Sequence, residues 1–208
     1  MTHQEERQRN RDAIIRAATA CFLADGIDKS TVSDIAERAG LTAMSVYRYY
    51  GAKQNLATAV ANHLLELYLT EHRERCAQTR PAAPETGFEE FARTLRLYLE
   101  VYEAHPEYIR FLQDISFYAA RENVSADIVY LRFATPEPGG LARPARAALR
   151  RGQEDGSVRR DFDFELVCMN MIDLLTGGVN FHTCVDERTQ FEILRINAEM
   201  IIYYVKSR

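Results

Sequence analysis

Apolar residues recur along most of this 208-residue chain at intervals of three and four positions, which is the spacing of one buried helical face. They do not alternate with polar residues over any strand-length stretch, so the pattern favours helices and no sheet. Glycine, proline and short polar segments divide the chain into about nine such stretches. The sequence therefore predicts an all-α fold.

The predicted helices form a short N-terminal group and a longer C-terminal group. Residues 1–52 are expected to form a three-helix head that begins with a frayed N-terminus, and residues 53–208 a helical body. A fourth helix, beginning at Lys53, is expected to join them as a rigid rod. The helices are expected at about residues 9–24, 32–39, 43–49, 53–76, 88–104, 106–122, 141–154, 162–182 and 189–207.

The stretch from Ser30 to Lys53 has the residues of two short helices joined by a tight turn. Thr31 and Thr42 are each placed to cap a helix start, because their hydroxyls can accept from free backbone N–H groups. Gly40, between them, can adopt the left-handed conformation that ends a helix. These parts make up a helix-turn-helix, whose second helix enters the major groove of DNA, although an ordinary helical hairpin has the same topology.

The second of these short helices carries more polar and aromatic side chains than packing requires. Val46 and Tyr50 are sufficient to anchor so short a helix. The neighbouring residues have hydroxyls and positive charges that suit DNA phosphates. They are Tyr47, Arg48, Tyr49 and Lys53.

A set of residues with characteristic spacing extends from the first predicted helix to the start of the fourth. Its members are Ile14, Ile15, Ala17, Ala18, Phe22, Gly26, Thr31, Val32, Asp34, Ile35, Ala36, Ala39, Gly40, Tyr47, Tyr49, Tyr50 and Lys53. This set resembles the N-terminal signature of the tetracycline-repressor-like (TetR) regulators. That signature looks like Ile-Leu-x-Ala-Ala with a later Phe and Gly, then Thr-Val-x-Asp-Ile-Ala-x-x-Ala-Gly, then Tyr-x-Tyr-Phe-x-x-Lys. The resemblance implies a DNA-binding head and a ligand-binding, dimeric body.

The resemblance also implies which residues contact DNA. Base-edge contacts are expected from Ala43, Met44 and Ser45, with Ser33 from the preceding helix. Arg48 is the strongest hydrogen-bonding side chain in range, for a base edge or for a phosphate. Phosphate contacts are expected from Thr31, Tyr47, Tyr49 and Lys53.

The charge of the chain changes what is expected of the head. Net charge is −4, made up of +1 over residues 1–55 and −5 over residues 56–208. The head is therefore only slightly basic, and specific binding is expected from placed contacts rather than from a broad positive field.

The first half of the body is rich in aromatic residues at helical spacing. Such stripes are typical of a core and, as a group, of a large apolar cavity. Polar residues within the apolar runs, namely Gln113, Asp114, Asn170, Asp173 and Asn180, would be costly if buried unpaired, so they bind ligand, bridge a dimer or satisfy one another. A small hydrophobic or aromatic effector is expected. The candidate ligand-binding residues are Tyr68, Phe91, Tyr98, Tyr102, Phe111, Asp114, Ile115, Tyr118, Asn170 and Asp173.

The last two predicted helices have apolar residues on more than one side, and a terminal helix with two apolar faces needs a partner from outside the chain. We therefore expect a homodimer through these two helices, which is also what the family resemblance implies. The residues concerned are Phe164, Leu166, Val167, Met169, Met171, Ile172, Leu174 and Leu175 in one helix and Ile193, Leu194, Ile196, Met200, Ile201, Tyr203 and Tyr204 in the other.

Other classes of function lack their signatures. No nucleophile elbow, phosphate loop or dinucleotide turn occurs, so neither an enzyme nor a cofactor is expected. His182, Cys184 and Asp186 match no standard metal-ligand spacing, and no metal is expected. The charged N-terminus and the lack of a membrane-length apolar run predict a cytoplasmic protein with no membrane partner.

Together these features predict a ligand-responsive transcriptional regulator, and by resemblance a repressor. It would bind a palindromic DNA operator as a homodimer and be released by a small hydrophobic molecule. The alternative is a helical small-molecule sensor or carrier that acts through a protein partner instead of DNA. The weak base-reading side chains of Ala43 and Met44 favour this alternative.

Overall fold

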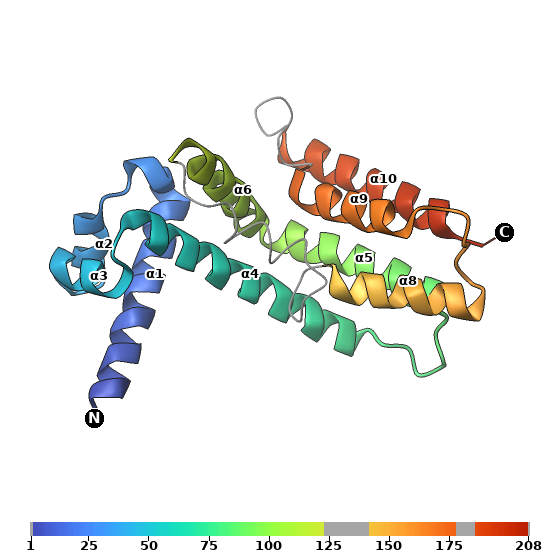
Figure 1. Ribbon diagram of the computed structural model, residues 1–208, viewed down its shortest axis with the longest axis horizontal. Helices are drawn as coiled ribbons and strands as arrows, with labels where there is room; N and C mark the ends of the chain where they lie inside the picture. Colours follow the sequence, from blue (N-terminus) through green and yellow to red (C-terminus); the bar gives the residue numbers. More distant parts are fainter. Residues whose placement is uncertain (1, 123–141, 178–185, 208) are drawn as a thin grey trace. The chain divides into compact units, whose positions relative to one another are not determined.

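The computed structural model describes residues 2–122, 142–177 and 186–207 of the chain. These residues contain nine α-helices and, outside the helices, a single isolated β-bridge between Val158 and Lys206. The prediction of an all-α fold with about nine helices is confirmed. The helices are α1 (His3–Lys29), α2 (Val32–Arg38), α3 (Ala43–Tyr50), α4 (Lys53–Gln78), α5 (Gly87–Ala104), α6 (Pro106–Arg121), α8 (Arg143–Asp155), α9 (Phe164–Gly177) and α10 (Glu187–Val205) (Figure 1).

The chain divides into two compact units. Unit 1 comprises residues 1–66 and 110–129, and unit 2 comprises residues 67–109 and 130–208. Helices α4 and α6 therefore each contribute residues to both units. The boundary expected between residues 52 and 53 divides the chain by function, into a DNA-binding part and a ligand-binding part. The two units divide it by packing, so the expected boundary stays a prediction.

The largest difference from the expected helix boundaries is at the start of the chain. Helix α1 begins at His3 instead of near residue 9, because Thr2 and Glu5 form a reciprocal capping box. The backbone N–H of Thr2 donates to Glu5 Oε2 at 2.8 Å, and that of Glu5 donates to Thr2 Oγ1 at 3.3 Å. At the other end the helix breaks at Gly26 (φ 81°), where a stop was expected, and a last short turn follows to Lys29.

Unit 1 is built around the apolar face of α1. Ile14 and Phe22 are buried there, with Ile35 from α2 and Val46 from α3. Helix α6 completes this core, since the ring of Phe111 stacks on that of Phe22 with centroids 6.0 Å apart. The head of the protein is thus closed by a helix that lies about ninety residues further along the chain.

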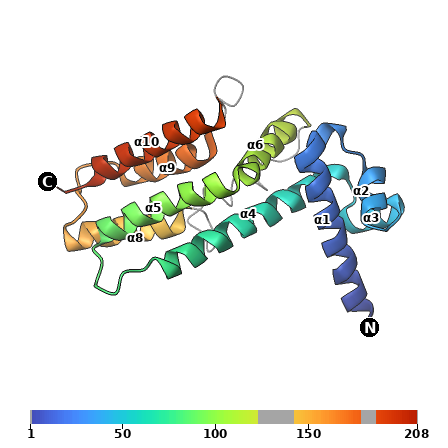
Figure 2. The same cartoon turned by 180° about the vertical axis from the view of Figure 1, so that it is seen from behind.

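Unit 2 packs α5 against α8, and α10 against both α5 and α9 (Figure 2). At the crossing of α5 and α8 two glycines, Gly87 and Gly152, let the backbones approach closely. The backbone N–H of Gly87 donates to Asp155 Oδ2 at 2.7 Å, and that of Phe88 donates to Ser157 Oγ at 3.0 Å. The first turn of α5 is therefore capped by the segment that ends α8.

We predict that Gly87→Ala destabilises the protein. A Cβ at this position would lie 2.0 Å from the backbone nitrogen of Gly152, so the two helices must separate. Overpacking of this kind costs about 1–3 kcal/mol, which outweighs the ~0.5–1 kcal/mol that alanine contributes over glycine in a helix. Urea unfolding measures the difference. Ala147→Ser, at an exposed position on α8, is the control; equal stability of the Gly87 variant and the control would contradict the close crossing.

Candidate functional site

The two short helices of unit 1 begin and end where local chemistry dictates. Thr31 and Asp34 form a capping box, in which the backbone N–H of Asp34 donates to Thr31 Oγ1 at 3.1 Å. The Thr31 hydroxyl in turn donates to Asp34 Oδ2 at 2.6 Å. This hydrogen bond, and that from the Thr31 backbone, hold the pKa of Asp34 below its ordinary value. The Thr31 hydroxyl, a predicted phosphate contact, is thus already engaged in the cap.

The turn between α2 and α3 is a glycine turn. Gly40 has a φ of 68°, and the N–H of Leu41 reaches back to the carbonyl of Ala36 at 2.9 Å. Thr42 then caps α3, since its Oγ1 accepts from the backbone N–H of Ser45 at 3.2 Å. The predicted helix, glycine turn and short second helix are all present.

Helix α3 exposes the face that a reading helix needs. Val46 is buried, whereas Met44 is 77% exposed and Tyr47 is 46% exposed. Arg48 is also exposed. A methionine that exposed on a helix of eight residues contributes nothing to a core, so this face is available to another molecule.

The remaining predicted DNA contacts lie on the same unit. Ser33 is exposed near the start of α2, and Ala43 and Ser45 are partly exposed at the start of α3. The Lys53 ammonium donates to the backbone carbonyl of Asp28 at 3.2 Å. The Tyr49 hydroxyl accepts from Asn10 Nδ2 at 3.3 Å. Sequence reasoning missed Asn10, because nothing in the local pattern joins residues thirty-nine positions apart.

The predicted ligand-binding residues are divided between the two units. Tyr68, Phe91, Tyr98 and Tyr102 lie buried in unit 2, where the Tyr68 hydroxyl donates to the Tyr98 carbonyl at 2.6 Å. Phe111, Ile115 and Tyr118 are buried in unit 1, Asp114 is exposed on α6, and Asn170 and Asp173 are exposed on α9. The side chain of Gln113 and all of Asn180 fall outside the described residues.

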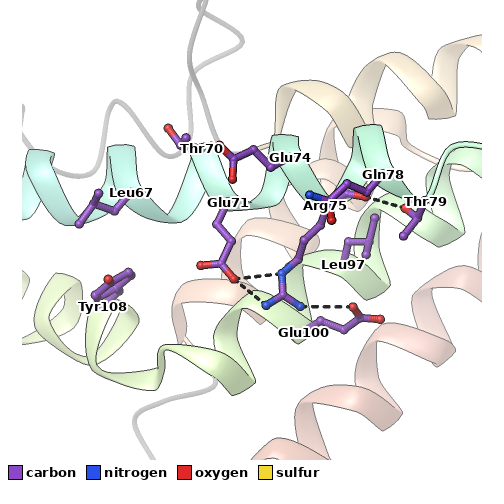
Figure 3. A pocket seen from close by; sticks show the side chains of 10 residues that line it. All are labelled: Leu67, Thr70, Glu71, Glu74, Arg75, Gln78, Thr79, Leu97, Glu100 and Tyr108. Carbon is purple, nitrogen blue, oxygen red and sulfur yellow. Dashed lines mark hydrogen bonds and ion pairs between the residues drawn. The ribbon is translucent and has the colours of Figure 1, made fainter.

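A groove of about 690 Å³ opens in unit 2 between α4, α5 and α6 (Figure 3). Arg75 lies between Glu71, at 2.5 Å, and Glu100, at 3.6 Å. Sequence reasoning did not identify this groove, since charged residues on helices are usually solvated. Its lining is acidic overall, with three glutamates and one arginine: Leu67, Thr70, Glu71, Glu74, Arg75, Gln78, Thr79, Leu97, Glu100 and Tyr108.

A second groove, of about 710 Å³, lies between α9 and α10. Asn170 and Asp173 line it together with Met200 and Tyr204. Around it both helices present large apolar side chains to solvent, which single soluble subunits rarely do. The exposed residues are Leu166, Met169, Ile193, Ile196, Met200, Tyr203 and Tyr204.

His72 is a buried titratable group in the aromatic core of unit 2. Its ring stacks on that of Tyr98 with centroids 3.6 Å apart, and its Nε2 lies 3.2 Å from the carbonyl oxygen of Thr94. The Cys76 sulfur is 3.5 Å from the same nitrogen. Burial lowers the pKa of His72 to about 4, because the charged ring would lose its hydration.

We predict that His72 makes the folded protein less stable in acid. In the folded state the ring stays neutral down to a pKa of about 4, whereas in the unfolded chain it binds a proton near its ordinary pKa of 6.5. Stability is therefore complete above pH 6.5 and falls as the pH drops toward 4, by about 2.5 kcal/mol at pH 4.5. Urea unfolding at pH 7.5 and 4.5 should show a smaller loss for His72→Gln. His63→Gln, on the same helix, should lose as much as the wild type; an unchanged loss in His72→Gln would disprove the assignment.

The described residues contain neither a candidate metal site nor a candidate membrane span. Within them no three His, Cys, Asp or Glu side chains gather in a way that could hold a metal ion. His182 and Cys184, which sequence analysis considered, lie outside the described residues. In the same part of the chain, no helix combines the length and the apolar character that crossing a bilayer requires.

The fold and the exposed α3 define a class of protein, the all-helical proteins with an N-terminal helix-turn-helix. The comparisons agree. Residues 14–60 match the family model described as "Bacterial regulatory proteins, tetR family". This part of the chain, which contains α2 and α3, is therefore similar to the tetR family.

Curated relatives match about two-fifths of the chain. It is similar to the HTH-type transcriptional regulator TtgR of Pseudomonas putida, with 32% identity over 84 residues, or 40% of this chain and 39% of TtgR. It thus spans about two-fifths of the length of the curated relatives it matches.

Solved structures match almost the whole chain. A protein of Rhodococcus sp., described as a TetR-family transcriptional regulator, aligns with a TM-score of 0.70 at 18% identity, over 94% of this chain and 99% of its own. One from Mesorhizobium loti MAFF303099 aligns with a TM-score of 0.68 at 18% identity, over 99% and 100%. At this identity the likeness shows the fold, which extends beyond the head to the full described chain.

Proposed function

We propose that this protein is a ligand-responsive transcriptional regulator, a repressor, that binds a palindromic operator as a homodimer and is released by a small molecule. The observation that carries the proposal is the exposed outer face of α3, an eight-residue helix in a helix-turn-helix that buries Val46 and presents Met44, Tyr47 and Arg48. A helix of this kind fits the major groove, and its flanking hydroxyls and Lys53 fit phosphates.

The base-reading part of the proposed interface is modest. Met44 and Ala43 offer apolar contact, for example with a thymine methyl, and Ser45 shares its hydroxyl with Thr42 at 3.0 Å. Arg48 is left as the strongest reader. Part of the sequence preference is therefore expected to come from DNA shape and from the spacing of two half-sites.

Dimer formation is proposed through α9 and α10. Their exposed side chains include the large apolar residues Leu166, Met169, Ile196 and Met200. Burying such a surface against its own copy removes it from water and gives a two-fold arrangement, which a palindromic operator mirrors.

Release by an effector requires that a change in the ligand-binding body reaches the DNA-binding head. Helix α6 contributes residues to both units, and within unit 1 it contacts α1. Ten residues after Phe111, which stacks on Phe22, Arg121 of the same helix donates to Asp28 Oδ1 at 2.5 Å. Asp28 is the residue whose carbonyl holds Lys53. A small shift of α6 would thus reach a proposed phosphate contact, and such couplings are typically worth about 1–3 kcal/mol.

The proposed effector is a small hydrophobic or aromatic molecule. The rings of Tyr68 and Tyr98 pack on one another with centroids 6.3 Å apart, so binding among them requires the rings to separate. The groove of Figure 3 offers volume already, with Leu67, Leu97 and Tyr108 as apolar parts of its wall. Its glutamates favour an effector that also carries a positive charge.

We predict that Tyr47→Ala and Lys53→Ala each weaken operator binding about tenfold, since each removes a phosphate contact. Mobility shifts on the DNA upstream of the protein's own gene measure this. Lys53→Ala should also reduce the salt slope of the affinity by about one. Arg16→Ala, which removes an exposed arginine on α1 outside the proposed interface, is the charge-matched control.

Unchanged affinity in both variants would rule out this docking of α3. If the wild type itself ignored DNA, the second candidate, a sensor that acts through a protein partner, would replace the regulator. The exposed Met44 is the observation that favours that candidate, because an apolar tip suits a protein surface as well as a thymine methyl.

We predict that Met200→Asp converts the dimer into a monomer, because it places a charge among the exposed apolar side chains of α9 and α10. Sedimentation velocity should show the change in mass, with a loss of operator affinity, since the two half-sites are no longer bound together. Arg188→Asp introduces the same side chain at an exposed position in the first turn of α10 and should remain dimeric. A dimeric Met200 variant would place the interface elsewhere.

A further inference from the structure

The N-terminal turns of α1 contain one residue that is not simply solvated. Residues 2–9 are all exposed, but Asn10 is partly buried and its Nδ2 donates to the hydroxyl of Tyr49 on α3 at 3.3 Å. Arg11 and Asp12 interact electrostatically with the neighbouring Tyr50, which places this turn of α1 beside the end of α3. This turn of α1 thus brings an amide to the proposed DNA-reading helix.

The direction of this hydrogen bond determines what Tyr49 can do. Because Asn10 donates, the Tyr49 oxygen is the acceptor and its own O–H remains able to donate. Phosphate oxygens are acceptors only. A hydroxyl kept as a donor at the end of α3 therefore matches the phosphate contact proposed for Tyr49.

Tyr49 has a second neighbour that concerns base reading. The guanidinium carbon of Arg48 lies 5.7 Å from the centroid of the Tyr49 ring. This cation–π contact restricts a long side chain that is otherwise exposed. Holding the ring of Tyr49 in one orientation thus also limits the directions in which Arg48 can point.

We propose that Asn10 is a positioning residue for DNA recognition: it fixes Tyr49 as a hydrogen-bond donor toward the phosphate backbone and as the platform on which Arg48 rests. The proposal rests on the proposed function, since it concerns how α3 meets DNA. It assigns to the first turns of α1 an indirect role in sequence preference, without contact between Asn10 and DNA.

The test is a double-mutant cycle on the full-length protein with Asn10→Ala, Tyr49→Phe and the double variant, measured by fluorescence anisotropy on an operator duplex. Each single variant should bind about threefold to tenfold more weakly, as expected for one lost hydrogen bond. The double variant should bind no more weakly than Tyr49→Phe, because Asn10 acts through the Tyr49 hydroxyl. Losses that multiply would overturn the proposal.

Two further readouts separate positioning from a merely structural role. Asn10→Asp keeps the shape but accepts from the Tyr49 hydroxyl, so it should bind more weakly than Asn10→Ala. Asn10→Ala should leave the salt slope unchanged, because no charge is lost, and should relax the preference at the base pair that Arg48→Ala affects. Wild-type affinity in Asn10→Asp, or an unchanged base preference in Asn10→Ala, would overturn the proposal.

Gln8→Ala is the matched control on the same helix. The Gln8 amide is exposed and donates to Asp12 at 2.8 Å, within α1, so its loss should leave DNA affinity and base preference as in the wild type. An equal loss in this variant would overturn the specific role of Asn10. The outcome is distinct from failure of the proposed function, which would already appear as a wild-type protein that does not discriminate operator from unrelated DNA.

Discussion

Helix α3 is the constraint on which the rest of the head depends. It has eight residues, and of its side chains only Val46 is fully buried. A helix that short does not persist in water by itself, and it cannot bury more surface without losing the face that reads DNA. It is therefore held from its ends and sides, by the Thr42 cap, by the core that Val46 enters and by the bond between Asn10 and Tyr49.

Within unit 1, two contacts that differ in burial join α6 to α1. The Phe22–Phe111 stack is buried, whereas the bond between Arg121 and Asp28 is exposed to solvent. The buried stack therefore contributes to the packing of α6 on α1, and the exposed ion pair, which solvent screens, contributes little to stability. An exposed pair is well suited to a contact that forms and breaks at low cost, next to the carbonyl that holds Lys53.

In unit 2, the residues that form the buried interior differ in kind from those that form the surface. Its aromatic side chains close a dry interior in which Tyr68 and His72 find backbone carbonyl partners, as buried polar groups require. Its charged residues instead line the open groove beside Arg75, and its exposed apolar residues gather on α9 and α10. Unit 2 thus combines an aromatic interior, a charged groove and a set of exposed apolar side chains.

The sequence by itself determined the all-helical class, the beginnings of α2 and α3, and the similarity of residues 14–60 to the tetR family. These features are local, since a cap, a glycine turn and a helical period each depend on residues within a few positions of one another. The early start of α1 also depends on local residues, the capping box of Thr2 and Glu5, although the predicted helix began near residue 9.

Only the tertiary structure decided which aromatic residues face one another and which partner each polar group takes. Tyr68 bonds to Tyr98 thirty positions away, and Asn10 bonds to Tyr49 across thirty-nine. The helical period indicates that Tyr68 and Tyr98 are turned inward, but not whether they meet a ligand or another ring. That distinction depends on how the helices pack, and packing joins residues that are distant in sequence.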